Sequence, residues 1–132
     1  MDSLEREVSA VLISEVAEKY QMTQDTLRYY ERVGLIPAVP RRPNGIRDYD
    51  EASCGWVEFI HCMRRAGVPV ETLIEYVQLY QQGEDTSPVR KQLLENELKN
   101  MDARIQALQA TRERLVCKIE HYDLYGVPKQ ST

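Results

Sequence analysis

The sequence predicts a fold dominated by α-helices, with a winged helix-turn-helix head and a long C-terminal helix that forms a coiled coil. Three observations predict it. Two short helical segments, each with its own start and stop signals, follow one another between residues 14 and 34. A stretch rich in arginine and proline with an Asn-Gly pair comes next, and a long segment with regularly spaced apolar residues follows later. Helical periodicity and turn signals in this order favour one compact head and one extended element.

Length and charge restrict the possible functions. A chain of 132 residues has room for one compact domain and one long element, but not for a separate large ligand-binding domain. Its formal net charge of -4 excludes a protein coated in positive charge for indiscriminate nucleic-acid binding. Residues 23–49, however, contain five arginines and three acids, a local net charge of +2. Any contact with nucleic acid is therefore expected from this local patch.

The first two helices are predicted from their caps. Ser14 is expected to cap a helix over residues 15–20, because a short hydroxyl side chain can accept a hydrogen bond from a free helical N–H group. A two-residue turn follows, and Thr23 is expected to cap the second helix. Gly34 is expected to end that helix, as a C-terminal glycine can. This arrangement is a helix-turn-helix.

The next segment is predicted to form a small β-hairpin, the wing. Asn44 and Gly45 precede Ile46 and Tyr49, and an Asn-Gly pair readily supplies the two positive φ angles of a hairpin turn. Asp50 is then expected to cap a third helix.

Three further helices are expected. The third runs to about Ala66 and ends at Gly67, and Pro69 opens a fourth that Gly83 ends. Ser87 is suited to cap the last helix.

The last helix carries an apolar seam with alternating spacings of four and three residues. The seam positions are Leu94, Leu98, Met101, Ile105, Leu108, Arg112, Leu115, Ile119 and Tyr122. Eight of the nine are apolar, over about 43 Å of helix, which the small head alone cannot bury. We therefore expect a homodimer. Arg112 interrupts the seam, and either it pairs with a partner carboxylate and fixes register, or its charged end extends outward into water.

The segment Thr-Leu-Arg-Tyr-Tyr-Glu-Arg-Val-Gly-Leu-Ile-Pro, residues 26–37, resembles the start of the MerR family of bacterial transcription regulators. The signature of that family is a helix-turn-helix ending in an LRYYE-x-x-GL-like sequence, and the resemblance covers nearly the whole chain. It implies a dimer whose long helices pair antiparallel and place two DNA-reading heads on one face of the duplex. It also implies that the dimer bends and untwists promoter DNA so that RNA polymerase can read it.

The resemblance also implies which residues contact double-stranded promoter DNA. The positions that match the family's contacts are Thr26, Arg28, Tyr29 and Tyr30 in the helix and Arg47 in the wing. Two further wing residues, Arg41 and Arg42, are predicted to neutralise phosphates. Tyrosines at helical spacing are more often core residues. The prediction of DNA binding therefore depends on the order of helix, wing and coiled coil.

Cys62 is the predicted sensor thiol. It lies in the segment Trp-Val-Glu-Phe-Ile-His-Cys-Met-Arg, residues 56–64, which resembles a MerR subgroup responsive to aldehydes and to nitrosative or other thiol stress. His61, Arg64 and Arg65 favour a thiolate, whereas burial would oppose one. The alternative is that Cys62 is a small buried apolar residue.

The other two cysteines are weaker candidates. Cys54 is near the start of the third helix, where the helix dipole would lower its pKa but two acids would raise it. Cys117 and His121 are one turn apart and could share a metal, but two ligands from one chain need others. Metal-sensing relatives also carry cysteines at the start of the last helix and in a loop after it, where this chain has none. We predict no metal site and no cofactor.

The sequence also predicts the class of protein and its location in the cell. The sequence has no nucleophile elbow, no phosphate-binding glycine loop and no HExxH motif, so no catalytic residues and no enzyme are expected. With no signal peptide and no long apolar run, we expect a cytoplasmic protein without membrane contact. The predicted domains are a head over 12–83 and a dimerisation helix over 87–122, with tails at 1–11 and 123–132. Alternatives are a coiled-coil adaptor that does not bind DNA, or a regulator of this fold responding to a metal or another ligand.

Overall fold

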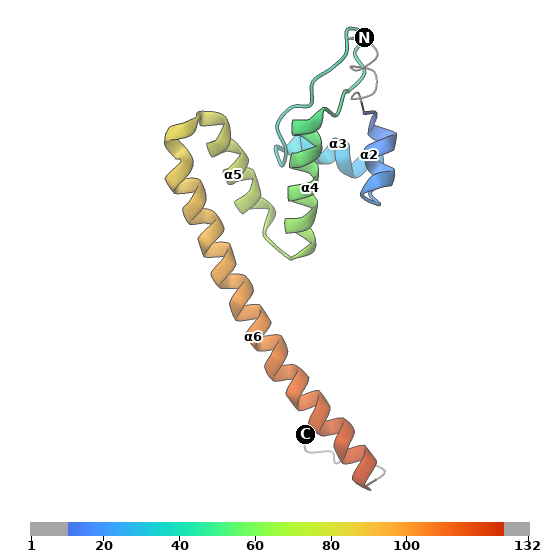
Figure 1. Ribbon diagram of the computed structural model, residues 1–132, viewed down its shortest axis with the longest axis vertical. Helices are drawn as coiled ribbons and strands as arrows, with labels where there is room; N and C mark the ends of the chain where they lie inside the picture. The colour runs from blue at the N-terminus through green and yellow to red at the C-terminus, as the bar shows by residue number, and fades with distance from the viewer. Residues whose placement is uncertain (1–10, 126–132) are drawn as a thin grey trace. The chain divides into compact units, whose positions relative to one another are not determined.

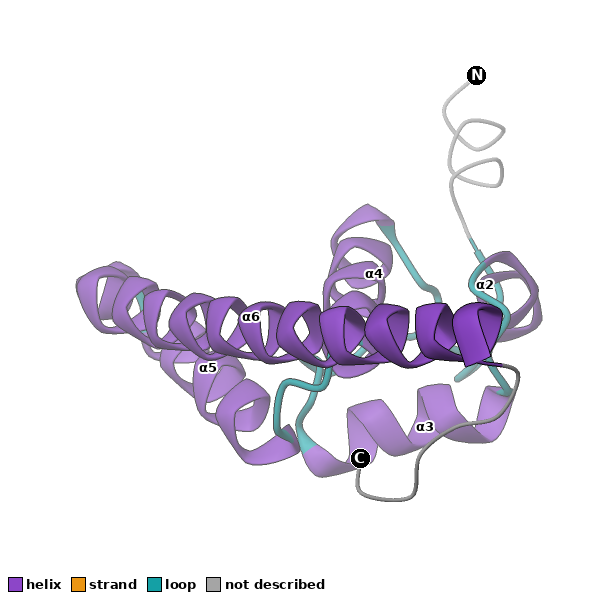
Figure 2. Cartoon of the chain, turned by 90° about the horizontal axis from the view of Figure 1, so that it is seen from below, coloured by secondary structure: helices purple, strands orange, loops and turns teal. Residues whose placement is uncertain are grey.

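The computed structural model describes residues 11–125, so the predictions for residues 1–10 and 126–132 lie outside the described part. Helices joined by loops make up this part, and it contains no β-strand (Figure 2). The elements are α2 (Ile13–Lys19), α3 (Gln24–Val33), α4 (Glu51–Arg65), α5 (Val70–Gln82), the 3₁₀ turn η1 (Glu84–Thr86) and α6 (Ser87–Tyr125), and Figure 1 labels the five α-helices. The chain divides into two compact units, with the boundary between Leu93 and Leu94. The prediction of a mostly helical chain with a long C-terminal helix is confirmed.

The start of α2 differs from the prediction. Leu12, not Ser14, is the N-cap residue, and the helix begins at Ile13. The backbone N–H of Leu12 donates to Glu15 Oε1 at 3.2 Å, and the Leu12 carbonyl accepts from the Glu15 N–H at 3.0 Å. A carboxylate in the first turn therefore binds the N–H of the cap residue, half of a capping box, and no Ser hydroxyl is needed.

The predicted signals at both ends of α3 are confirmed. Thr23 caps the helix, because its hydroxyl oxygen accepts a hydrogen bond from the Thr26 N–H at 3.0 Å. Gly34 ends the helix with a φ of 87°, in the left-handed region that glycine adopts without strain. The turn before α3 contains Gln21, whose φ of 55° is uncommon for a residue with a side chain.

The core of the head is built by one face of each helix and by the segment after α3. Its members are apolar residues with at most 2% of their surface exposed: Val16, Leu27, Leu35, Ile36, Tyr49, Val57, Ile60, Val68, Leu73 and Val77. Burying a side chain of this kind contributes about 1.5 to 3 kcal/mol. The core thus holds α3 and the loop that follows it on a common support.

The α3–α4 loop, residues 34–50, folds back on itself without forming strands. A single antiparallel bridge joins Arg41 to Arg47. The Gly45 N–H donates to the Arg42 carbonyl and the Arg42 N–H donates to the Ile46 carbonyl, both at 2.8 Å. Two side chains also close the tip of the loop: Arg41 donates to the Gly45 carbonyl, and Asn44 Oδ1 accepts from the Ile46 N–H, both at 3.1 Å.

The turn in this loop is not the one predicted from Asn44 and Gly45. Gly45 has a φ of 86°, but Asn44 is not in the left-handed region. The β-turn covers residues 42–45 instead, one position earlier. Pro43, with its fixed φ near −65°, is suited to the first central position of such a turn. Gly45 then supplies the one positive φ that brings the chain back.

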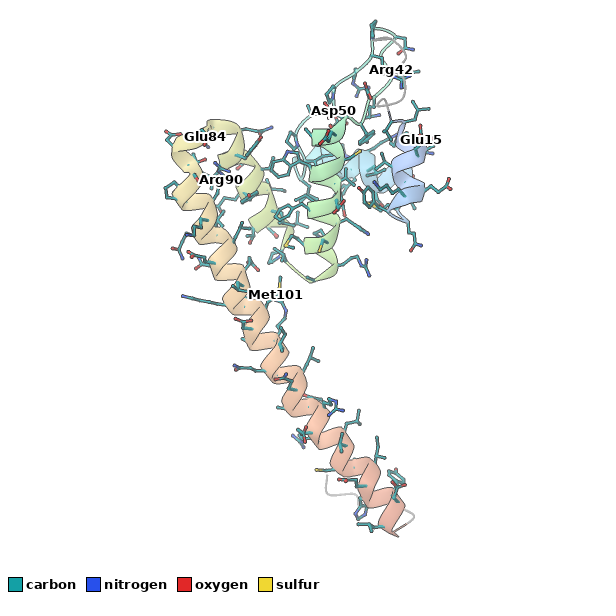
Figure 3. The ribbon with its side chains drawn as sticks, viewed as in Figure 1. Glu15, Arg42, Asp50, Glu84, Arg90 and Met101 are labelled. Atoms are coloured by element: carbon teal, nitrogen blue, oxygen red, sulfur yellow. The ribbon has the colours of Figure 1, made fainter. Side chains whose placement is uncertain are left out.

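The C-terminal end of the loop is anchored to the head. Tyr49 is fully buried, and its backbone N–H donates to the Val11 carbonyl at 2.8 Å. Asp50 caps α4 as predicted, because its carboxylate accepts from the Ser53 N–H at 2.8 Å, and it lies at the start of that helix in Figure 3.

Helices α4 and α5 bring four aromatic rings together. Trp56 makes edge contacts with Phe59, Tyr76 and Tyr80 at centroid distances of 5.0 to 6.3 Å. The connection to α6 is fixed by Thr86, whose hydroxyl lies 2.7 Å from the carbonyl of Leu79.

α6 is one continuous helix of 39 residues (Figure 1). Within this single chain most of its predicted seam is exposed to solvent, with 69% of the Leu108 surface and 61% of the Leu115 surface accessible. No helix in the described residues is long and apolar enough to cross a membrane.

Candidate nucleic-acid interface

Helix α3 presents a mixed surface of hydroxyl, phenol and guanidinium groups. Tyr29 is 38% exposed, and the Arg32 guanidinium lies over its ring at 5.5 Å, a cation–π contact. Thr26 is half-buried, and its hydroxyl lies 2.8 Å from that of Thr23. Tyr30 is only 6% exposed, and burial raises the pKa of its phenol. Tyr30 therefore belongs mainly to the core, and a contact between its side chain and DNA stays a prediction.

Arg28 is held at the start of α3 by two neighbours. Its guanidinium donates to Asp25 Oδ1 at 3.0 Å and to Gln24 Oε1 at 3.2 Å. The Asp25 side chain is 96% exposed, and an ion pair in water contributes about 0 to 1 kcal/mol. Arg28 can therefore exchange Asp25 for a phosphate or a base edge at low cost.

The α3–α4 loop carries the other three predicted cations. Arg41 donates to the carbonyl of Gly45 at 3.1 Å, across the turn. Arg42 is half-buried and lies on this loop in Figure 3. Arg47 points back to α3.

Arg47 and Glu31 connect the loop to α3. The Arg47 Nε donates to Glu31 Oε1 at 2.7 Å, and the Val39 N–H donates to Glu31 Oε2 at 2.9 Å. Burial alone would raise the pKa of Glu31, but the hydrogen bonds from Arg47 and Val39 outweigh it and hold the pKa below its ordinary value. Glu31 is therefore a carboxylate that fixes both sides of the loop. The role of Glu31 could not be predicted from the sequence, because Glu31 and Arg47 are 16 residues apart and no local pattern connects them.

A hollow of about 570 Å³ lies between α3 and the C-terminal end of α4. It is lined by Gln21, Met22, Thr23, Thr26, Tyr29, Tyr30, His61, Arg64 and Arg65. We call it the α3 hollow. Three of the residues predicted to contact DNA thus share a surface with a cluster of basic residues from α4. The sequence showed that this cluster exists, but only the packing of α4 on α3 places it here.

The three cysteines lie in different surroundings. Cys54 is half-buried, and its thiol donates to the Tyr49 carbonyl at 3.4 Å. Burial, followed by the charges of Asp50 and Asp48, raises the pKa of this thiol, which disfavours the reactive thiolate. Cys62 and Cys117 are both exposed.

Cys62 opens into a second hollow, of about 450 Å³. Its lining residues are Tyr20, Glu58, His61, Cys62, Arg65 and Ala66. We call it the Cys62 hollow. The alternative of Cys62 as a buried apolar residue is wrong, because the side chain is accessible. His61 and Arg65 line both hollows, so these two side chains lie next to the Cys62 thiol and also next to the surface of α3.

Within residues 11–125, no three or more His, Cys, Asp or Glu side chains are grouped so that they could hold a metal ion. Cys117 and His121 therefore have no third ligand of these types beside them in this part of the chain.

Two family models match the chain. A model of the MerR family regulatory protein matches residues 12–49, and a model described as MerR, DNA binding matches residues 55–116. The chain is also 54% identical over 85 residues to the HTH-type transcriptional regulator AdhR of Bacillus subtilis (strain 168). That match covers 64% of this chain and 61% of AdhR, so the chain spans less than two thirds of that relative.

Solved structures agree with the family models. A MerR family transcriptional regulator from Listeria monocytogenes is 39% identical, with a TM-score of 0.83 and coverage of 87% of each chain. HiNmlR, described as a MerR family regulator lacking the sensor domain and bound to promoter DNA, is 25% identical, with a TM-score of 0.78 and coverage of 89% of this chain and 95% of HiNmlR. All three relatives are named as regulators. From its family models, its similarity to these regulators and its fold, the chain belongs to the MerR family of DNA-binding transcriptional regulators.

Proposed function

We propose that this regulator works as a cytoplasmic homodimer that binds double-stranded promoter DNA and distorts it to control transcription by RNA polymerase, with modification of Cys62 as the trigger. In this proposal α3 and the α3–α4 loop, acting as the wing, contact the DNA.

The observation that supports this DNA face most strongly is the tie between Glu31, Arg47 and Val39. It holds the arginine-bearing loop at a fixed place beside α3. A surface that is ordered before binding loses less conformational entropy when it meets the duplex. Phosphate contacts from Arg41 and Arg42 would set the register, and Arg28 and Tyr29 would reach base edges. The similarity to HiNmlR, a protein described as bound to promoter DNA, supports the same face.

The homodimer is supported by the exposed seam of α6. Leu98, Leu108 and Leu115 each expose more than half of their surface within the single chain. An apolar row of this length in water favours association with a second copy, and the alternating spacing of its members is that of a coiled coil. The resemblance to the family supports the antiparallel direction.

The thiol trigger is supported by the two hollows. Cys62 is accessible, and His61 and Arg65 line both the Cys62 hollow and the α3 hollow. An adduct on Cys62 would displace one or both of these side chains and so change the surface beside α3. Bending a promoter site costs on the order of 1 to 6 kcal/mol. A free-energy difference of that size between two orientations of the heads is sufficient to switch the DNA between two shapes. The affinity for DNA need not change much.

Transcription from a promoter that the protein binds tests this function. DNA fragments that the protein retains from its own genome identify the promoter, and transcription is then followed with purified RNA polymerase. The wild-type protein and the Cys54→Ser and Cys117→Ser variants should respond to an aldehyde or a nitrosothiol. The Cys62→Ser variant should bind the same DNA but give no response. A dimer without salt-dependent affinity for any promoter fragment would instead favour a coiled-coil adaptor.

A further inference from the structure

The Cys62 hollow contains opposite charges on either side of the thiol. Glu58 precedes Cys62 by four residues and Arg65 follows it by three, so all three side chains lie on one face of α4. Glu58 and Arg65 are seven positions apart, about 10 Å along the helix axis. No ion pair joins them in the described part of the chain. The hollow therefore has an acidic end and a basic end, with the thiol between them.

The two ends differ in how their charges are bound. The Tyr20 hydroxyl donates to Glu58 Oε2 at 3.2 Å, so the residue that follows α2 holds the carboxylate at its end of the hollow. Arg65 is exposed, and within residues 11–125 its guanidinium has no hydrogen bond and no ion pair. Its neighbour Arg64 is different, because its guanidinium donates to the Val68 carbonyl at 2.6 Å and it does not line this hollow. A guanidinium with open donors binds carboxylates in a two-pronged geometry.

We infer that the Cys62 hollow is selective for small electrophiles that carry a carboxylate, and that Arg65 is the residue that positions that carboxylate. Glu58 repels the negative group and so directs it to the Arg65 end, which leaves the electrophilic carbon beside the sulfur. The inference rests on the proposed function, because it names the class of reagent for the proposed sensor thiol. A hollow of about 450 Å³ is within the range of small-molecule sites.

For an aldehyde that carries a carboxylate, the reaction is an addition. The Cys62 thiolate attacks the carbonyl carbon, a carbon–sulfur bond forms, and the π electron pair of the carbonyl moves to its oxygen. That oxygen takes up one proton, which replaces the one the thiol lost, and the product is a hemithioacetal. No oxidant or reductant is consumed. The carboxylate stays on Arg65, and this removes a free cation from the wall of the α3 hollow.

Two alkylating agents of nearly equal size test this inference. Iodoacetate carries a carboxylate, iodoacetamide is neutral, and both react by the same step: the sulfur bonds to the CH₂ carbon, iodide leaves, and the thiol proton goes to solvent. The protein is the full chain with Cys54→Ser and Cys117→Ser, so that Cys62 is the only thiol. Mass spectrometry gives the two rates, and their ratio cancels the intrinsic reactivity of the thiol. The same chain unfolded in urea supplies the reference ratio.

In the folded protein the ratio of the iodoacetate rate to the iodoacetamide rate should exceed the reference about three- to tenfold at low salt. Arg65→Gln should bring it back to the reference, Arg65→Lys should keep most of it, and Glu58→Gln should raise it further. Arg64→Gln is the matched control and should leave it within about twofold. Because Glu58 and Arg65 are exposed, these variants should stay folded, which circular dichroism checks.

A ratio equal to that of the unfolded chain, or equal losses in Arg64→Gln and Arg65→Gln, would overturn the inference. The labelling experiment does not measure transcription, so its failure leaves the proposed trigger intact. Conversely, a Cys62→Ser variant that still responds in transcription would remove the trigger without changing the selectivity of the hollow.

Discussion

Arg47 and Glu31 lie 16 residues apart and are joined by a hydrogen-bonded ion pair of 2.7 Å, which fixes the α3–α4 loop to the side of α3. The side chains are 24% and 14% exposed, so this pair is more shielded from water than the Arg28–Asp25 pair. It positions the surface proposed to face DNA, and several consequences can be measured.

Removing the cation of this pair should destabilise the head. Arg47→Ala leaves the half-buried Glu31 carboxylate with only the Val39 N–H. The free energy of unfolding should fall by about 1.5 to 3 kcal/mol, the usual contribution of a hydrogen bond to a charged group. Urea denaturation measures it. Arg42→Ala, which removes another cation of the same loop, should cost less than about 0.5 kcal/mol and serves as control. An equal loss of unfolding free energy in the two variants would mean that the Arg47–Glu31 pair does not stabilise the head more than an ordinary surface cation does.

The same carboxylate predicts a pH dependence. The pKa of Glu31 is lower in the folded protein than its ordinary value of 4.5. Below 4.5 the unfolded chain therefore binds more protons than the folded one, and stability decreases as the pH falls through the folded pKa. Stability above 4.5 keeps the full contribution. Other acids titrate in the same range, so the difference between wild type and Glu31→Gln is the observable. The two curves of unfolding free energy should converge as the pH falls below 4.5; curves that remain parallel would show that Glu31 is not involved.

Arg28 should contribute to base preference. Arg28→Ala should cost about 1 to 3 kcal/mol on the preferred DNA site and reduce discrimination between sites. Asp25→Asn removes the acid that competes for the same guanidinium and repels phosphates, so it should bind more tightly. Fluorescence anisotropy with several duplexes, repeated over a range of salt concentrations, gives both effects. If Arg28→Ala keeps wild-type affinity and site preference, the DNA face has been placed wrongly.

The seam of α6 predicts what a charge at its middle would do. Leu108 is 69% exposed in the single chain. In a paired seam Leu108→Asp would bring a carboxylate into the apolar contact, and in an antiparallel pair it would meet its own copy or lie close to it. The variant should be monomeric or unfolded by light scattering. The control is Gln106→Asp, which adds the same charge at the residue after the seam position Ile105, outside the seam. This variant should stay dimeric. A Leu108→Asp dimer of normal mass would contradict the coiled coil.

Much of the head could be predicted from the sequence because its signals are local. Thr23 and Asp50 each bond an N–H three residues further on, and Gly34 ends α3 through its own φ. These interactions depend on a few neighbouring residues, which a sequence pattern contains.

The features that could not be predicted have two causes. Some depend on competition between neighbouring local signals, and others depend on contacts between residues far apart in the sequence. A carboxylate at Glu15 replaced the expected Ser14 cap, and Pro43 moved the turn one residue away from Asn44 and Gly45. The link between Arg47 and Glu31 arises only when the loop folds back on the core. For the same reason the accessibility of Cys62, and the two hollows that share Arg65, could not be predicted from residue spacing.

We propose that the dimer changes the shape of promoter DNA and that Cys62 controls this change. Fluorescence energy transfer between dyes at the two ends of a promoter duplex measures it directly. We predict that binding alters the transfer efficiency, that treatment with an aldehyde or a nitrosothiol alters it again with less than about a threefold change in affinity, and that Cys62→Ser binds without the second change. A bound duplex with the transfer efficiency of free DNA, before and after treatment, would contradict the account.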